Sequence, residues 1–343
     1  MNKKKILFIG GSLNQTSMLY EVSKHLPNYN HYFTPFYADG ILDWAASKGW
    51  LDFTSLGGQH KKLTEDFLEK HNCKIDYKGR EHYYDLAIIS SDLIVQNNIR
   101  GKKIILIQEG MTDPENLMYY LVKLFRLPRY LASTSTTGLS DAYDIFCVAS
   151  EGYKELFIRK GVKPHKIRVT GIPNFDNVQK YCSNNFPHKN FVLAATSDAR
   201  ETLKYENRKR TILNAVKLAK GKQLIFKLHP NENIDRAKKE ISKYAPEALV
   251  YTNHDIKEMI ANCDILITQY SSVVYIGLAL GKEVYSNFPT EQLKALTPIQ
   301  NNGTSAQRIA LLAEELIEKP KESFEKVNEG FRIKGILKTQ PLN

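Results

Sequence analysis

Short apolar runs rich in β-branched residues recur along the whole chain and predict buried strands. Continuous runs of this kind are typical of parallel sheets, whose strands are covered on both faces. We predict strands at Lys5–Ile9, Asp85–Ser90, Lys103–Gln108, Asp144–Ala149, Ile167–Thr170, Phe191–Thr196, Leu224–Leu228, Asp264–Thr268 and Glu283–Ser286.

Segments with helical periodicity lie between these strands. Apolar residues spaced i, i+3, i+4 and i+7 indicate helices at Ile212, Ala215, Val216 and Ala219 and at Ile256, Met259, Ile260 and Cys263. Alternation of strand and helix over the full length predicts an α/β protein with doubly wound parallel sheets, rather than a barrel or a sandwich.

Length and a polar break predict two domains. The 343 residues exceed the usual size of one domain, and a polar stretch at Tyr181–Asn185 precedes a new strand. We assign residues 1–172 to a first Rossmann-like domain, 173–325 to a second, and 326–343 to a C-terminal tail or helix that can pack back on the first. Two such domains face each other across a cleft, with ligands near the carboxyl ends of the strands.

Composition excludes several classes of protein. No run approaches the ~20 apolar residues that span a bilayer, and the apolar run at Ile6–Ile9 ends at Gly10–Gly11 without a cleavage site, so it is interpreted as a strand and not as a signal peptide. Cysteines without paired spacing predict neither a zinc site nor disulfides and favour the cytoplasm; they are Cys73, Cys147, Cys182 and Cys263.

A formal net charge of +11 favours anionic partners such as nucleotides, phosphorylated acceptors or anionic lipid. The basic residues are spread along the chain and no nucleic-acid-binding motif accompanies them, so we predict no nucleic acid partner. A solvated basic surface without a specific partner is the alternative.

The strand at Leu224–Leu228 ends abruptly at His229–Pro230. Proline fixes the backbone there, and a histidine at a strand end can donate to a phosphate or act as acid or base. A second strand, Asp264–Thr268, leads through Gln269–Ser272 into an apolar helix at Val273–Leu280. Serine hydroxyls and amides at a helix start suit phosphate, although serines also cap helices for structural reasons alone.

Three motifs in order, Gly171–Asp176, Lys227–Pro230 and Asp264–Tyr275, resemble the CDP-glycerol glycerophosphotransferase and capsular polysaccharide (Kdo-type) transferase families. These families have the GT-B fold, which consists of two Rossmann-like domains facing across a cleft. The non-hydrolysing UDP-N-acetylglucosamine 2-epimerases have a similar Gly-x-Pro and His-Pro layout and are a more distant resemblance.

The resemblance implies that His229 and the Ser271–Ser272 turn hold a donor diphosphate, while Gly171–Pro173 line the hinge. The donor-binding candidates are Gly171, Pro173, Thr196, Ser197, Lys227, His229, Tyr270, Ser271 and Ser272. Two positions depart from the family pattern: Gln269 stands where Asp is common, and Ile276 where an acidic residue usually holds the ribose hydroxyls.

The first half carries candidate residues for the acceptor side. A Gln108–Glu109 pair after a strand is similar to a motif of Kdo-type transferases and makes Glu109 the candidate base, with Asp113 as the second choice; Asp113–Pro114 also suits a plain helix start. Gly10, Gly11 and Ser12 form the loop that faces the acceptor in GT-B proteins, and the irregular Tyr32–Glu81 is interpreted as an acceptor-side insertion.

The stretch Leu117–Tyr130 interleaves apolar residues with cations. We interpret it as a core helix whose basic side chains reach the solvent. The alternative is a helix resting on an anionic membrane that carries lipid-linked acceptors, at the inner face of the cell membrane.

Together with these patterns, the family resemblance implies a transferase that moves a sugar or glycerol-phosphate unit from a CDP-, CMP- or UDP-linked donor to a cell-surface polysaccharide or lipid-linked acceptor. We expect no cofactor and no metal, since the chain has no Asp-x-Asp motif. A UDP-sugar 2-epimerase and a non-catalytic nucleotide-sugar-binding accessory protein are the alternatives.

Overall fold

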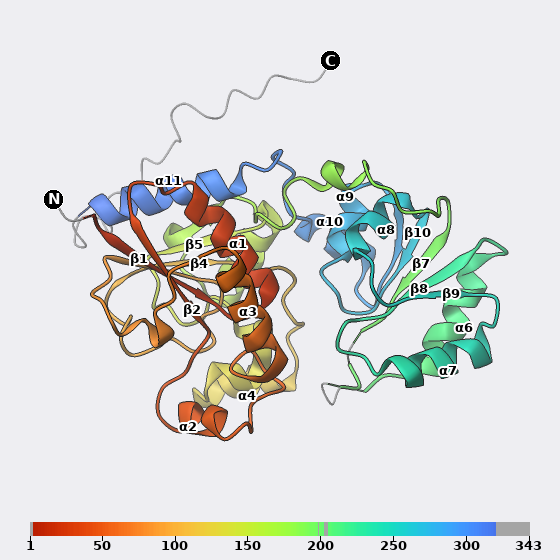
Figure 1. Ribbon diagram of the computed structural model, residues 1–343, viewed down its shortest axis with the longest axis horizontal. Helices are drawn as coiled ribbons and strands as arrows, with labels where there is room; N and C mark the ends of the chain where they lie inside the picture. The colour runs from red at the N-terminus through yellow and green to blue at the C-terminus, as the bar shows by residue number, and fades with distance from the viewer. Residues whose placement is uncertain (1–2, 198, 202–204, 320–343) are drawn as a thin grey trace, which may run out of the picture.

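A computed structural model describes residues 3–197, 199–201 and 205–319. Within these ranges the chain forms two parallel sheets, each covered by helices, so the predicted α/β class with doubly wound sheets is confirmed (Figure 1). The predicted tail at 326–343 lies outside the described residues.

The first sheet has the strand order β2-β1-β3-β4-β5-β6, and every pair in it is parallel. Its strands are β1 (Lys5–Gly10), β2 (Asn30–Pro35), β3 (Leu86–Ile89), β4 (Lys103–Ile107), β5 (Ile145–Val148) and β6 (Ile167–Val169). The first-domain helices are α1 (Leu13–Lys24), α2 (Ile41–Ser47), α3 (Gly58–Lys70), α4 (Leu117–Phe125) and α5 (Glu151–Lys160).

The second sheet has the order β11-β10-β7-β8-β9, again all parallel. Its strands are β7 (Val192–Ala195), β8 (Leu224–Lys227), β9 (Leu249–Tyr251), β10 (Ile265–Ile267) and β11 (Glu283–Tyr285). The later helices are α6 (Arg208–Ala219), α7 (Ile234–Tyr244), α8 (Ile256–Asn262), α9 (Val274–Ala279), α10 (Thr290–Leu296) and α11 (Ser305–Glu318), and short 3-10 segments occur at Tyr77–Gly79, Arg129–Thr136, Pro164–Lys166 and Val178–Tyr181.

The chain crosses between the domains twice. It leaves the first sheet after β6 and returns in α11, which packs against α1 and β4 of the first domain (Figure 1). The buried Asp176 carboxylate accepts a hydrogen bond from the Ser305 amide at 2.8 Å, and the Ser305 hydroxyl donates to the Thr170 carbonyl at 3.0 Å. These bonds fasten the start of α11 to the outgoing crossover, so a segment that we assigned to the second domain contacts the first.

The domains also touch directly. The hydroxyls of Tyr153 on α5 and Tyr275 on α9 are buried and lie 2.7 Å apart. A hydrogen bond between two buried hydroxyls satisfies both groups away from water. Burial raises the pKa of Tyr275 to about 12, so this hydroxyl remains protonated at neutral pH.

The helix predicted over Leu117–Tyr130 is not a core helix. Of α4 only Tyr119 and Val122 are buried, whereas Leu124 is 74% exposed. Other exposed apolar side chains of this stretch are Leu117, Met118, Tyr120, Phe125, Leu127 and Tyr130. No helix in the described ranges is long and apolar enough to cross a membrane.

Gly152→Ala tests the contact between the domains. A Cβ built at Gly152 on α5 would collide with the backbone carbonyl of Ala295 on α10. Alanine normally stabilises a helix by about 1 kcal/mol over glycine, but overpacking costs about 1–3 kcal/mol. We expect the thermal midpoint to fall.

Glu155→Ala, on the exposed side of α5, is the matched control and should leave the thermal midpoint nearly unchanged. A midpoint raised by Gly152→Ala would mean that α5 and α10 do not pack as the structure has them.

Candidate functional site

A cavity of about 190 Å³ lies between the two domains. First-domain residues on its wall are Asn14, Glu109, Gly110, Met111, Thr112 and Asp113, and second-domain residues are Tyr270, Ser272 and Phe288. A Cβ on Gly110 would lie 3.4 Å from the Ser272 Cβ, so the two domains come close at this wall. The fold therefore brings the predicted carboxylates of one half to the predicted serine turn of the other.

The Glu109 carboxylate is held by the first loop of the protein. It accepts hydrogen bonds from the Ser12 hydroxyl at 3.2 Å, from the Asn14 side-chain amide at 3.4 Å and from the Gln15 side-chain amide at 2.5 Å. Two parallel strands, β1 and β4, end at the same edge, which explains why residues so far apart in the sequence meet.

The loop residues Gly10 and Gly11 are small because α1 packs closely on them. A Cβ on Gly10 would collide with the Thr16 hydroxyl, and one on Gly11 would lie 2.5 Å from the Gln15 side-chain oxygen. Ser12 caps α1 by accepting from the Gln15 amide at 3.2 Å. The sequence-predicted acceptor loop and the candidate base are thus one connected structure.

Asp113 lines the cavity but does not start a helix. Its amide donates to the Thr134 hydroxyl at 2.9 Å. The helix α4 begins at Leu117, and its N-cap is Asn116, whose side chain accepts from the Tyr119 amide at 3.0 Å. The Asp113 carboxylate is therefore not used for capping and stays available at the cavity.

His229 is fixed at the carboxyl end of β8. Its amide donates to the Thr196 hydroxyl at 3.1 Å and to Glu232 at 3.0 Å, and its Nδ1 accepts from the Asn231 amide at 3.3 Å. An acceptor role for Nδ1 assigns the proton of the neutral ring to Nε2. The His229 residue is partly exposed.

Three strand ends of the second sheet form one row. The central strand β7 ends at Ala195 and leads to Thr196–Ser197. It lies between β8, which leads to His229, and β10, which leads to the serine turn. The Ser197 hydroxyl donates to the Gln269 side chain at 3.0 Å. Two strand spacings separate β8 from β10, or about 10 Å, so the row can face a diphosphate from both sides.

In the Ser271–Ser272 turn, the hydroxyl groups are better placed than the backbone amides to donate hydrogen bonds to a ligand. The amides of Val274 and Tyr275 donate to the carbonyls of Ser271 and Ser272 at 3.2 and 3.1 Å. The helix α9 also has only six residues, so its dipole is small. This geometry does not favour a contribution from helix-terminal amides, and the partly exposed Ser271 and Ser272 remain candidate hydroxyl donors.

Tyr270 and Phe288 give the cavity an aromatic wall. Tyr270 is 57% exposed, and its ring meets Phe288 edge to face with the centroids 5.1 Å apart. Exposed aromatic rings of this kind can stack on a nucleobase.

Of the nine predicted donor-binding residues, Tyr270 and Ser272 line the described cavity, whereas Thr196, Ser197, His229 and Ser271 lie outside its lining. The remaining three have other positions. The Lys227 ammonium is buried and donates to the carbonyls of Leu228 and Thr252, both at 2.9 Å, so it does not face a donor. Gly171, at φ +75°, is buried against the Ser305 hydroxyl, and neither it nor Pro173 is among the described residues that line the cavity. Instead Asn174, next in the hinge, donates to the Asn14 side chain at 2.8 Å.

The two departures from the family pattern have structural roles. Gln269 donates to Glu206 at 3.1 Å and to Thr211 at 3.0 Å, which ties the turn to α6. Ile276 is fully buried in the core and cannot face a ribose.

A buried ion cluster behind His229 escaped the sequence analysis. Arg208, only 4% exposed, pairs with Glu232 and with Glu206. Glu232 also accepts from the Thr196 hydroxyl and the His229 amide. Burial raises the pKa of Glu206. The cluster therefore sets the position of His229, and its only signal in the sequence is Glu232 in the His-Pro-Asn-Glu run.

Comparisons with known proteins agree with this architecture. The model of the family CDP-Glycerol:Poly(glycerophosphate) glycerophosphotransferase matches residues 60–276, more than half of the chain. This match confirms the resemblance inferred from the three motifs. A comparison with curated proteins finds no match.

Solved structures share the fold at low identity. The UDP-GlcNAc 2-epimerase of Neisseria meningitidis bound to UDP-GlcNAc is 13% identical, with 91% of this chain and 100% of that chain covered and a TM-score of 0.58. S. aureus MnaA with UDP is 14% identical, with coverage of 94% and 89% and a TM-score of 0.54. The wall teichoic acid polymerase TagF is 13% identical, with coverage of 94% and 90% and a TM-score of 0.49. The first two of these structures, with TM-scores above 0.5, support the expected GT-B class, which is confirmed.

Glu232→Ala tests the buried cluster. The substitution leaves the Arg208 guanidinium buried with one partner fewer, and breaking a buried pair typically costs about 3–5 kcal/mol. We expect a large fall in the urea midpoint of the second domain.

Glu291→Ala, which removes an exposed pair with Lys294 in the same domain, should change stability by less than about 1 kcal/mol. Equal effects of the two substitutions would contradict a buried, structurally required Glu232.

Proposed function

Because this chain belongs to the CDP-Glycerol:Poly(glycerophosphate) glycerophosphotransferase family, we propose that it transfers glycerol phosphate from CDP-glycerol to a hydroxyl of a poly(glycerophosphate) acceptor. The predicted class, a transferase that uses a nucleotide-activated donor and acts on a cell-surface polymer, is confirmed by this membership. The choice of donor and acceptor, and the residues that perform the reaction, are our proposal.

The observation that carries the proposal is the shared cavity of Glu109 and Ser272. The donor lies on the second domain, with its diphosphate facing His229, Thr196–Ser197 and the Ser271–Ser272 hydroxyls. The cytosine faces the Tyr270–Phe288 wall. With Ile276 buried and Gln269 bound to α6, the ribose must be held differently from the usual acidic contact.

The reaction is a displacement at the phosphorus that carries glycerol. An acceptor hydroxyl oxygen, presented by the loop Gly10–Ser12, attacks this phosphorus while Glu109 takes its proton. The bond from this phosphorus to the bridging oxygen breaks, and CMP leaves with the electron pair. Nε2–H of His229 and the serine hydroxyls stabilise the negative charge that grows on CMP, and each such donor is typically worth a few kcal/mol.

Asp113 is the second candidate base because it lines the same cavity. No metal enters the proposed reaction, because hydroxyl and imidazole donors face the phosphates. We therefore propose that no divalent cation or other cofactor is required.

Glu109→Gln tests the assignment of the base. The substitution keeps the shape of the side chain but removes the proton acceptor, so we expect transfer to fall about 10²–10⁴-fold. CDP-glycerol binding, measured by calorimetry, should stay within about threefold, because Glu109 lies on the acceptor side. The assay contains excess EDTA, which should leave the wild-type rate unchanged.

Asp113→Asn is the matched variant. A larger loss of transfer from Asp113→Asn than from Glu109→Gln would reassign the base. Turnover of UDP-N-acetylglucosamine without acceptor would favour the epimerase alternative, and donor binding with no turnover by the wild type would favour the accessory-protein alternative.

We also propose peripheral contact of the first domain with an anionic membrane. Exposed apolar side chains gather on α4 and around α2, and both helices lie at the lower end of the first domain in Figure 1. Around α2, Ile41 is 83% exposed, and Trp44, Trp50 and Phe53 are exposed as well. Amphipathic aromatic and basic surfaces of this kind rest at the lipid interface.

Leu117→Glu with Leu124→Glu tests this contact. The double variant places two charges on the exposed face of α4, and we expect its binding to phosphatidylglycerol vesicles in co-sedimentation to fall at least about tenfold. Leu213→Glu with Val216→Glu adds the same charges to exposed positions of α6 and should bind as the wild type does. Unchanged binding of the α4 variant would exclude α4 from the contact.

A further inference from the structure

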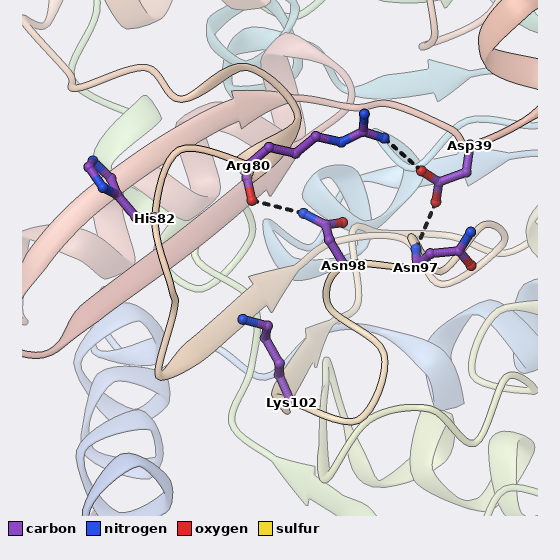
Figure 2. A pocket seen from close by; sticks show the side chains of 7 residues that line it. Asp39, Arg80, His82, Asn97, Asn98 and Lys102 are labelled. Carbon is purple, nitrogen blue, oxygen red and sulfur yellow. Dashed lines mark hydrogen bonds and ion pairs between the residues drawn. The ribbon is translucent and has the colours of Figure 1, made fainter.

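A second pocket, of about 510 Å³, lies within the first domain and has no role in the reaction above. Its described lining is Asp39, Gly79, Arg80, His82, Asn97, Asn98 and Lys102 (Figure 2). Three of these side chains can be cationic and one is a carboxylate. The pocket therefore has the charge of an anion site.

The Asp39 carboxylate already accepts hydrogen bonds from other residues of the pocket wall. Asp39 accepts from the Arg80 guanidinium at 3.1 Å and from the Asn97 amide at 2.7 Å. Asn98 donates to the carbonyls of Lys78 and Gly79 at 2.9 and 2.8 Å and accepts from the Tyr37 hydroxyl at 2.8 Å. These bonds join three separate segments and hold the wall in place.

The Lys102 ammonium is placed to bind an anion. The Lys102 ammonium lies 4.0 Å from the centre of the Tyr83 ring and, within the described residues, hydrogen-bonds to no carboxylate. Burial lowers the pKa of Lys102, so a nearby anion would stabilise its charged form. Figure 2 shows the Lys102 side chain directed toward the space below Arg80 and Asn98.

Arg80 uses one nitrogen for Asp39, and a guanidinium has five N–H donors in all. His82 packs its ring on Tyr32 with the centroids 4.5 Å apart. This leaves N–H donors of Arg80 and Lys102 for a ligand, whereas Figure 2 shows the His82 ring directed away from both.

A third pocket connects this region with the acceptor loop. It has about 300 Å³, and its lining includes Phe36, Tyr37, Tyr77 and Lys78. The next residues along the same two segments, Asp39 and Gly79–Arg80, line the cationic pocket, so the two pockets share a wall. On the other side, a Cβ on Gly11 would lie 3.4 Å from the Phe36 Cβ.

From Phe36 to Asp39 the chain spans at most about 11 Å. The acceptor loop and the middle pocket are therefore neighbours. Lys102 precedes β4 and Glu109 follows its other end, so a ligand that reaches both must run along the strand for roughly 20 Å. This order suits a linear ligand whose end lies at Glu109 and whose body crosses the first domain.

We propose that the pocket of Arg80 and Lys102 binds a phosphodiester of the acceptor chain, behind the hydroxyl that reacts. The inference rests on the proposed function and deepens it, since it makes the acceptor a linear polymer held at more than one phosphate. The middle pocket has aromatic and apolar walls, and its charged lining residues are Lys61, Lys78, Asp43 and Asp52, with Lys78 paired to Asp43 at 2.7 Å. It accommodates the uncharged glycerol of the segment between. Longer acceptors then bind better than short ones, because they reach the cations.

Arg80→Ala with Lys102→Ala tests the proposal. Transfer is measured with synthetic glycerol-phosphate oligomers of one repeat and of many repeats. For the long acceptor we expect KM to rise about tenfold or more, the change expected for losing charge-assisted hydrogen bonds. The kcat, and the KM for the short acceptor, should not change.

Lys24→Ala with Lys154→Ala is the matched control. It removes two exposed lysines of the same domain, each paired with a glutamate of its own helix, and neither lines the described pockets. An equal rise of KM in this control, or no rise in the pocket variant, would overturn the proposal. Thermal midpoints confirm that both variants fold.

A binding assay separates this proposal from the proposed function. Fluorescence anisotropy of a labelled long oligomer, without donor, should show about tenfold weaker binding for the pocket variant only. If the wild type transfers to no acceptor, the proposed function fails, yet the binding assay still decides whether the pocket holds a phosphodiester. Equal binding by wild type and pocket variant would contradict it.

Discussion

The direction of the strands is the constraint on which this structure depends. Both sheets are entirely parallel in the described residues, and a cavity between the domains is lined by residues that follow β4 and β10. In a parallel sheet, the loops that follow the carboxyl ends of the strands lie at the same edge. Two short chemical motifs that are far apart in the sequence can therefore meet without any long functional loop.

Several buried polar contacts keep these edges together. Asp176 and Ser305 fasten the two crossovers, and Tyr153 and Tyr275 join the domains through their hydroxyls. Behind the cleft, Arg208 and Glu232 hold the backbone of His229 in place. A site preorganised in this way need not reorganise as charge develops on a phosphate. The positive first domain adds attraction for a polyanionic acceptor.

The nine strands that the sequence predicted are all present, because buried parallel strands leave a clear apolar signal. The two strands that it missed, β2 and β9, are sheet edges. β9 has no buried residue and β2 is buried only over its second half, so the apolar pattern is weak there. Lys227 was misassigned because a basic residue beside His-Pro suggests phosphate, whereas strand geometry turns its ammonium to backbone carbonyls. Arg208 and Glu232 meet through the fold, which one sequence does not reveal.

A crystal structure of the Glu109→Gln protein with CDP-glycerol tests the central claim most directly. The account predicts the diphosphate between His229 Nε2 and the Ser271–Ser272 hydroxyls, within hydrogen-bond distance of both, with the glycerol phosphate directed toward residue 109. A diphosphate that contacts only one of these groups, or that lies outside the cleft between the domains, would contradict it.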